Sequence, residues 1–149
     1  MKLAIAIAIL VTASPADART QPAVEHLGRP AVNGQTLPFS DAVRVGDILY
    51  LSGQIGVGPD GKLPNGIEAQ TRQALENVGV ILKRRGLDYG NVFHCTAMLA
   101  DMKLWPEFNK AYLEFFPEPP LPARSAFGAN GLALGALMEI ECQAYAGKK

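Results

Sequence analysis

The sequence predicts a two-layer α+β sandwich, in which one mixed sheet carries two helices on one face. Two segments, 65–85 and 104–116, repeat apolar residues at helical spacing. Strand-like segments at 43–52, 92–99 and 137–145 precede, separate and follow them. A hairpin, a helix, a strand, a second helix and two closing strands provide too few helices to cover both faces of a sheet. We therefore expect both helices on the same face.

The start of the chain has the composition of a secretory signal. Lys2 supplies a positive charge, an apolar run follows at 3–11, and the Ala-Asp-Ala tripeptide at 16–18 has the small residues that a signal peptidase recognises. The apolar run is too short to span a bilayer, although an uncleaved anchor is the alternative. We predict a signal peptide at 1–18, a single domain at 19–149, and a secreted or periplasmic protein.

The charge balance argues against two classes of partner. The chain has 14 basic and 14 acidic residues, and removal of the signal takes away one of each, Lys2 and Asp17. Nucleic acids and anionic membrane surfaces attract a concentrated basic face. We therefore expect no nucleic-acid partner, and no membrane association once the signal is cleaved. The basic cluster at 83–85 falls in the last turn of the first helix, where cations complement the helix dipole.

The first helix is the clearest element of the chain. Asn65 and Glu68, three residues apart, are typical of a capping box at a helix start. Gly86 follows the last turn, where glycine commonly ends a helix. The apolar stripe that should face the core consists of Ile67, Thr71, Ala74, Leu75, Val78, Ile81 and Leu82.

Proline and glycine mark the ends of other elements. The Gly46-Asp47 pair is a tight turn between the two apolar halves of the first hairpin. Pro106 lies in the first turn of the second helix, and Pro117 ends that helix. Its expected buried stripe is Phe108, Tyr112 and Phe115.

The strands at 92–99 and 137–145 each have two different faces. One face of the first is apolar (Phe93, Cys95, Ala97, Leu99), and so is one face of the second (Met138, Ile140, Cys142, Ala144). Cys95 and Cys142 thus share the face that helices should cover. A disulfide is possible in an oxidising compartment, and buried free thiols are the alternative. Neither cysteine has a histidine at metal-binding spacing, so we expect no metal site.

The other face of the sheet is too apolar to be exposed to water. Either Leu49 and Leu51 or Ile48 and Tyr50 must lie on it, together with Val92 and Met98. A bare face of this kind would aggregate, and the sequence offers no third helix to cover it. Another copy of the chain is the expected cover. We predict a homo-oligomer in which Glu139 points toward a boundary between subunits.

Two opposite charges stand out near the end of the chain. Arg124 lies in a Pro-Ala-Arg-Ser segment, Glu139 follows fifteen residues later, and the segment 126–138 between them carries no charge. Apolar neighbours place both charges near low-dielectric walls, where a charge must pair or bind something. The spacing leaves two interpretations open: an ion pair that closes a hairpin, and a pair of groups that bind a ligand.

Several segments resemble the Rid (YjgF-type) family of reactive-intermediate deaminases. They are Ser52-Gly53-Gln54-Ile55, the run at 70–77, Asp101, Asn109 and Tyr112, and Pro122-Ala123-Arg124-Ser125 followed by Met138-Glu139-Ile140. The resemblance covers about residues 24–147. It implies a chorismate-mutase-like fold and a homotrimer with active sites in the clefts between subunits. The bare sheet face agrees with that arrangement.

The resemblance also implies an activity. Members hydrolyse short-lived 2-imino and enamine acids, such as 2-iminopropanoate, to 2-oxo acids and ammonia, which makes them hydrolases of C–N bonds. By position, Arg124 would bind the substrate carboxylate, Glu139 would orient the attacking water, and the backbone of Ala126 would contact the substrate. Ser52 and Asn109 would be polar groups of the cleft. A guanidinium suits a carboxylate and a carboxylate can accept a proton from water, so no metal or organic cofactor is implied.

The chain departs from the family pattern at several positions. Phe39, expected beside the substrate, stands where a tyrosine is frequent, so a hydrogen bond from that position is lost. Ala126 stands where a cysteine is common, and Asn130 where a small or basic residue is more usual. Most members are also cytosolic, whereas this chain carries an export signal. These departures leave the physiological substrate open.

Two other functions remain as alternatives. A non-catalytic, carboxylate-binding or regulatory homotrimer would use Arg124 as an anchor and would tolerate loss of Glu139, whereas a hydrolase would lose turnover. A nuclease, suggested for some relatives, is disfavoured by the balanced charge. We interpret His94 as a strand residue bonded to a neighbour or water, and Glu141 as a partner for a neighbouring subunit.

Overall fold

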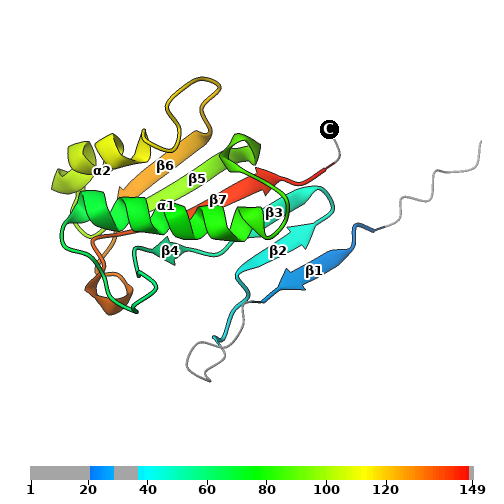
Figure 1. The fold of residues 1–149 in the computed structure, drawn as a ribbon, viewed down its shortest axis with the longest axis horizontal. Coiled ribbons are helices and arrows are strands. Elements are labelled where there is room, and N and C mark those ends of the chain that lie inside the picture. The colour runs from blue at the N-terminus through cyan, green and yellow to red at the C-terminus, as the bar shows by residue number, and fades with distance from the viewer. Residues whose placement is uncertain (1–20, 29–36, 148–149) are drawn as a thin grey trace, which may run out of the picture.

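The computed structural model describes residues 21–28 and 37–147 of the chain. The described chain forms one seven-stranded sheet with both helices on one face, as Figure 1 shows. This arrangement confirms the predicted fold class. The predicted signal peptide lies outside the described residues. Within them, no helix is long and apolar enough to cross a membrane.

The sheet has the strand order β1-β2-β3-β7-β5-β6, and the short strand β4 also pairs with β7. The strands are β1 (Val24–Leu27), β2 (Ala42–Val45), β3 (Ile48–Leu51), β4 (Gln54–Ile55), β5 (Val92–Leu99), β6 (Ala123–Gly128) and β7 (Met138–Tyr145). The helices are α1 (Ile67–Lys83) and α2 (Trp105–Tyr112), with short 3-10 turns at Tyr89–Asn91, Met102–Leu104 and Ala133–Gly135. Every pairing is antiparallel except that of β5 with β6, which is parallel. The predicted β2–β3 hairpin is confirmed, and its turn uses Gly46 at a φ of 57°.

The helix α1 buries the predicted stripe but begins differently from the prediction. Its N-cap is Gly66, at a φ of 82°, and no side chain caps the helix. The predicted capping box is therefore wrong, because Asn65 precedes the cap and Glu68 lies one position too early to reach back to it. At the other end, Gly86 has a φ of 69° and ends the helix as predicted.

The helix α2 is shorter than predicted. After Tyr112 the chain tightens into turns, in which the Glu114 N–H donates to the Ala111 carbonyl and the Phe115 N–H donates to the Tyr112 carbonyl. These bonds join residues three positions apart, so each turn contains fewer residues than a turn of an α-helix. Phe116 is the buried residue of this turn, and Phe115, which was predicted to be buried, is only partly buried.

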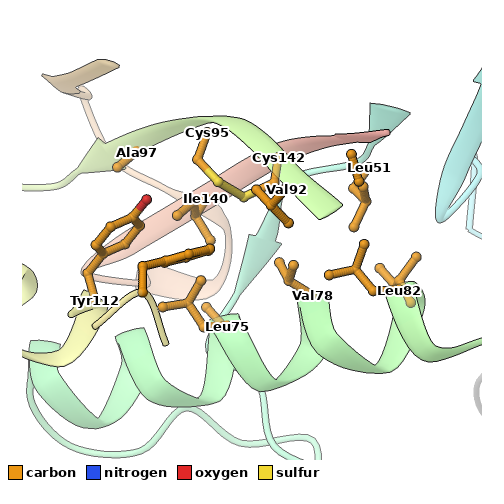
Figure 2. Close-up of a cluster of buried hydrophobic side chains, with 14 of the residues drawn as sticks. Leu51, Leu75, Val78, Leu82, Val92, Cys95, Ala97, Tyr112, Ile140 and Cys142 are labelled. Carbon is orange, nitrogen blue, oxygen red and sulfur yellow. A yellow bond between two sulfur atoms is a disulfide. The ribbon is translucent and has the colours of Figure 1, made fainter. Parts of the chain in front are cut away.

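The core lies between the two helices and the sheet, and Figure 2 shows its centre. Leu75, Val78 and Leu82 of α1 are buried in one cluster with Ile140 of β7 and Leu51 of β3. Burying a leucine-sized side chain contributes about 1.5–3 kcal/mol, so this stripe fixes α1 on the sheet. Cys95 and Cys142 are register partners on β5 and β7 and form a buried disulfide. Of the two predicted possibilities, the structure contains the disulfide.

The strand β5 begins with a bulge that the sequence pattern does not reveal. The register with β7 shifts between Val92 and His94. The bulge adds one residue to β5, which shifts the alternation of faces by one position. As a result, Val92 is buried and Phe93 is 41% exposed. The prediction that Phe93 faces the core, and that Val92 lies on the opposite face, is therefore wrong.

The face of the sheet away from the helices is open in a single copy of the chain. Leu49 and Leu51 are buried beneath α1, so Ile48 and Tyr50 alternate to the other face. Tyr50 is 45% exposed there, and Phe127 of β6 is 50% exposed. We refer to this surface, to which Tyr50, Met98, Phe127 and Glu139 contribute, as the open face.

Candidate functional site

Arg124 rests on an aromatic wall. It lies on β6 as the register partner of Cys95, so it points to the helix side of the sheet. There its guanidinium carbon is 4.3 Å from the ring centre of Tyr112, 4.8 Å from that of Trp105 and 5.4 Å from that of Phe108. These three residues lie on one face of α2, at helical spacing. Stacking of this kind fixes the plane of a guanidinium and attracts its charge.

Asn109, from the same face of α2, also contacts Arg124. The Arg124 Nη2 donates a hydrogen bond of 2.7 Å to Asn109 Oδ1. Arg124 makes no ion pair with any described residue. Burial lowers the pKa of its guanidinium, which nevertheless stays charged at neutral pH. A half-buried guanidinium that is oriented but not neutralised is prepared to bind an anion.

Ala126 continues the same face of β6. It is the register partner of the buried Ala97 and is half-buried. We call Arg124, Asn109, Ala126 and the aromatic wall the arginine group. The structure thus brings together three of the predicted site residues.

Glu139 lies on the open face, on the other side of the sheet. It is the register partner of Met98 on β5 and of Ile55 on β4. Its carboxylate covers the backbone of Gly53 so closely that a Cβ added there would overlap it. Burial raises the pKa of Glu139, and the neighbouring Glu141 carboxylate raises it further. A carboxylate with a raised pKa accepts a proton more readily than an ordinary one.

The loop between β3 and β4 supports Glu139. Ser52 Oγ donates a 2.7 Å hydrogen bond to the Ser40 carbonyl, which ties this loop to the segment that carries Phe39. The Gln54 side chain donates to the carbonyls of Ser52 and Gly53, at 3.0 Å and 2.9 Å. Phe39 itself is 53% exposed. We call Glu139, Gly53, Ser52 and Phe39 the acid group.

The arginine group and the acid group are not in contact within one copy of the chain. Arg124 and Glu139 point to opposite faces of the sheet, and β5 separates their strands. The interpretation of these two residues as an ion pair closing a hairpin is therefore wrong. Spacing along the sequence suggested that β6 and β7 are neighbours, but the parallel pairing of β5 with β6 places β6 at the sheet edge.

Two contributors to the site were not assigned a role from sequence. The position of Trp105 at the start of the second helix predicts only a packing role, and Gly53 is one residue of the Ser52-Gly53-Gln54-Ile55 segment. The spacing of Trp105, Phe108, Asn109 and Tyr112 was a signal that these residues share one helix face. No sequence signal shows that the Glu139 carboxylate lies over Gly53, because that contact joins distant segments.

His94 and Glu141 lie on the open face with Glu139. His94 is the register partner of Gln143, and Glu141 that of Thr96. Glu141 is exposed, which leaves it accessible to a neighbouring molecule. Within the described residues, no group of histidine, cysteine, aspartate and glutamate side chains could hold a metal ion.

Comparison with known proteins identifies the family. A family model described as Endoribonuclease L-PSP matches residues 30–146. A chloroplastic Reactive Intermediate Deaminase A from Arabidopsis thaliana is 42% identical over 107 residues, which are 70% of this chain and 57% of that relative. The 2-iminobutanoate/2-iminopropanoate deaminase of mouse is 42% identical over 112 residues, or 74% of this chain and 82% of the relative.

The chain belongs to the Rid family. Its fold also matches the crystal structure of Escherichia coli TdcF with bound serine, with a TM-score of 0.70 and 30% identity, over 80% of this chain and 92% of TdcF. The names of the Rid relatives mention deaminases, whereas the family model mentions a nuclease.

Proposed function

We propose that this Rid chain hydrolyses reactive 2-imino and enamine acids, such as 2-iminopropanoate, to 2-oxo acids and ammonia. The observation that carries the proposal is the arginine group, in which Arg124 is oriented by Asn109 and three rings but has no carboxylate partner among the described residues. The mouse relative is named for the same class of substrate. The serine bound to TdcF shows that a related fold holds a small amino acid.

The residues suit each step of this reaction. Arg124 would clasp the substrate carboxylate with two N–H groups and hold the imine carbon in place. Water would attack the carbon of the protonated imine while Glu139 takes one of its protons, and the C=N electron pair would move to nitrogen to give a carbinolamine. Glu139 would then pass this proton to the amino nitrogen. Ammonia would leave as the C=O bond forms, and the hydroxyl proton would return to Glu139 and from there to water. This sequence balances without a metal or an organic cofactor.

We infer that the site is assembled from two copies of the chain in a homotrimer. Arg124 and Glu139 point to opposite faces of one sheet, so a substrate can touch both only if they come from different protomers. The open face, with Tyr50 45% and Phe127 50% exposed, gives a second copy an apolar surface to cover. Glu139 and Gly53 lie on that face, which would place the acid group at the boundary.

We also infer that the mature protein is secreted or periplasmic. The start of the sequence has the pattern of a secretory signal. A buried disulfide between Cys95 and Cys142 suits an oxidising compartment. Secretion of the full-length chain with loss of residues 1–18, measured by mass spectrometry of the mature N-terminus, is the expected result.

The test of the activity is an ammonia-release assay on imino acids generated in situ by an amino-acid oxidase. Wild type should release ammonia faster than the uncatalysed background, and Arg124→Ala should return to that background. Arg124→Lys should recover little, because an ammonium cannot reproduce the two-pronged clasp. Glu139→Gln should lower the rate about a hundredfold, the usual size of general-base catalysis. Equal rates for wild type and Arg124→Ala would contradict the proposal.

One observation favours a non-catalytic carboxylate-binding homotrimer as the second candidate. Phe39 has no hydroxyl, so the acid group lacks a donor that related proteins often supply. A binder needs Arg124 but not Glu139. If wild type releases ammonia only at the uncatalysed background rate and Glu139→Ala leaves ligand binding unchanged, this second candidate is favoured.

A further inference from the structure

A cavity lies on the helix side of the sheet, at the end formed by β1–β3 and far from the arginine group on β6. It has a volume of about 340 Å³ and lies between the C-terminal end of α1 and the strands β1–β3. Figure 1 shows that β1 and β2 extend past the layer of helices at this end of the sheet. The lining residues are Glu25, Leu27, Arg44, Leu49, Arg84, Arg85 and Ala146. This volume is within the range of small-molecule sites.

The floor of the cavity is apolar, and three guanidinium groups and the Glu25 carboxylate surround it. Leu27 and Leu49 of the floor are 5% and 1% exposed and belong to the core. Arg44 comes from β2, whereas Arg84 and Arg85 come from the end of α1. An aliphatic floor with cations around it matches a molecule that has an anionic head and an apolar body.

Arg44 is held in position before any ligand binds. Its Nε donates to the Gly46 carbonyl at 2.8 Å, and its Nη2 donates to the Ala146 carbonyl at 3.2 Å. These two bonds to backbone fix the guanidinium plane, so little side-chain entropy is lost when an anion binds. The Nη1 group of Arg44 donates to no described residue.

The acidic partners of these arginines leave them incompletely bonded. Arg85 is 3.8 Å from Glu25, and Arg44 is 3.8 Å from Asp47, distances too long for hydrogen bonds. The side chains in both pairs are 39–62% exposed, so these contacts contribute little to stability. Arg84 donates through Nη1 to Asp41 at 3.2 Å, which leaves its other N–H groups available. A ligand carboxylate can bond at closer range than Glu25 or Asp47 does.

We propose that this cavity binds a small carboxylate with a short branched aliphatic chain, at a site separate from Arg124. Arg44 and Arg85 bind the carboxylate, Arg84 adds positive charge, and Leu27 and Leu49 contact the aliphatic chain. The carboxylate is the preferred head because a guanidinium binds it with two parallel hydrogen bonds. The apolar floor favours a carboxylate that carries an aliphatic chain over a bare inorganic anion.

The test uses 3-methylbutanoate as the probe and Arg124→Ala as the protein background, so that binding at the arginine group is removed. Calorimetry should show binding of 3-methylbutanoate, with at least about tenfold weaker binding of its neutral amide, since charge-assisted bonds are lost. The Leu27 and Leu49 methyl resonances should shift on titration. Inorganic phosphate should bind more weakly than 3-methylbutanoate.

Variants of the lining arginines test whether these side chains bind a ligand or only form surface ion pairs. Arg44→Gln with Arg85→Gln should weaken binding about tenfold or more, while Arg72→Gln, on the far part of α1, should not. Arg85→Gln alone serves if the double variant fails to fold, because that side chain is 39% exposed. Equal binding by acid and amide, tighter binding of phosphate, unchanged binding by the folded variants, or no shift of the two methyl groups would overturn the proposal. None of these outcomes depends on deaminase activity.

Discussion

At the scale of single residues, the two charges of the site are desolvated in different ways. Arg124 is shielded by aromatic rings and keeps one hydrogen bond, whereas Glu139 is shielded by the backbone of the β3–β4 loop. Shielding strengthens the attraction of Arg124 for an anion and makes Glu139 a better proton acceptor. In both cases the shielding comes from uncharged neighbours, and the Glu141 carboxylate adds to the effect on Glu139.

The first prediction concerns Gly53→Ala. The added methyl group would overlap the Glu139 carboxylate, which can move because it is the end of a flexible side chain. We expect the ammonia-release kcat to fall about tenfold to a hundredfold, as misplacement of a catalytic group does, with little change in Tm. Gly28→Ala is the control, because nothing lies within 4 Å of a Cβ at that position. An unchanged kcat for Gly53→Ala would show that the position of Glu139 does not matter.

The second prediction concerns pH. Glu139 must be ionised to accept a proton, and burial followed by Glu141 raises its pKa. The acid limb of kcat/KM should therefore lie above the range of an ordinary carboxylate. Glu141→Gln removes the second cause, so the limb should move to lower pH, measured with the same substrate at constant ionic strength. If the acid limb does not move, Glu139 is not the group whose titration controls kcat/KM.

The same raised pKa has a consequence for stability. The folded state holds the Glu139 proton more tightly than the unfolded state does, so this contribution favours folding at low pH. It is lost as the pH rises from the unfolded value through the folded one. In Glu139→Gln this loss should be absent, which urea unfolding at pH values below and above that window would reveal.

At the scale of elements, α2 determines how β6 presents its arginine. The four residues that contact Arg124 all come from this helix, and α2 is part of the crossover that lets β6 run parallel to β5. Parallel neighbours need such a connection. The helix therefore belongs to the connection between β5 and β6, and it also forms the aromatic wall of the site.

The third prediction concerns Tyr112→Phe. Tyr112 is 5% exposed, and its hydroxyl has no hydrogen-bond partner among the described residues. Removing a buried hydroxyl that lacks a partner should raise the free energy of unfolding by up to about 1 kcal/mol, while the ring still stacks on Arg124. Chemical denaturation measures the first effect, and ammonia release the second. A loss of activity would mean that the hydroxyl takes part in the reaction.

Elements were predictable from sequence where the pattern is local and regular. The stripe of α1 and the strand β5 follow from periodicity, and the Gly46 turn follows from its residue type. The bulge at Phe93 and the end of α2 were missed, because both depend on pairing and packing against other segments. Arg124 and Glu139 were identifiable as charges that need partners, but their opposite faces follow from a parallel strand pairing that spacing cannot show.

At the scale of the whole molecule, one covalent link joins the middle of the chain to its end. The fourth prediction is that reducing the Cys95–Cys142 disulfide lowers the free energy of unfolding. The cysteines are 47 residues apart, for which the loss of chain entropy in the unfolded state gives about 4 kcal/mol. Urea unfolding with and without a reductant measures the change. The Cys95→Ala/Cys142→Ala variant is the control and should not respond to the reductant.

The fifth prediction concerns assembly. Arg124→Ala and Glu139→Ala protomers should each be inactive alone, but refolded together in equal amounts they should regain about one quarter of wild-type activity. That fraction follows because random mixing places an intact arginine group beside an intact acid group at one boundary in four. Sedimentation should give a trimer for each protein. No recovery in a mixed trimer would mean that both groups act from the same copy.

The aromatic wall has one more consequence. Arg124, Asn109, Ala126 and the rings beneath the guanidinium all lie in the uninterrupted run 105–126. The acid group, in contrast, is collected from Phe39, Gly53 and Glu139, in three distant parts of the chain. The residues that recognise the anion therefore form one contiguous, exchangeable segment of the chain. A relative could inherit a new substrate preference by exchanging that one stretch, while the hydrolytic half of the protein stays as it was.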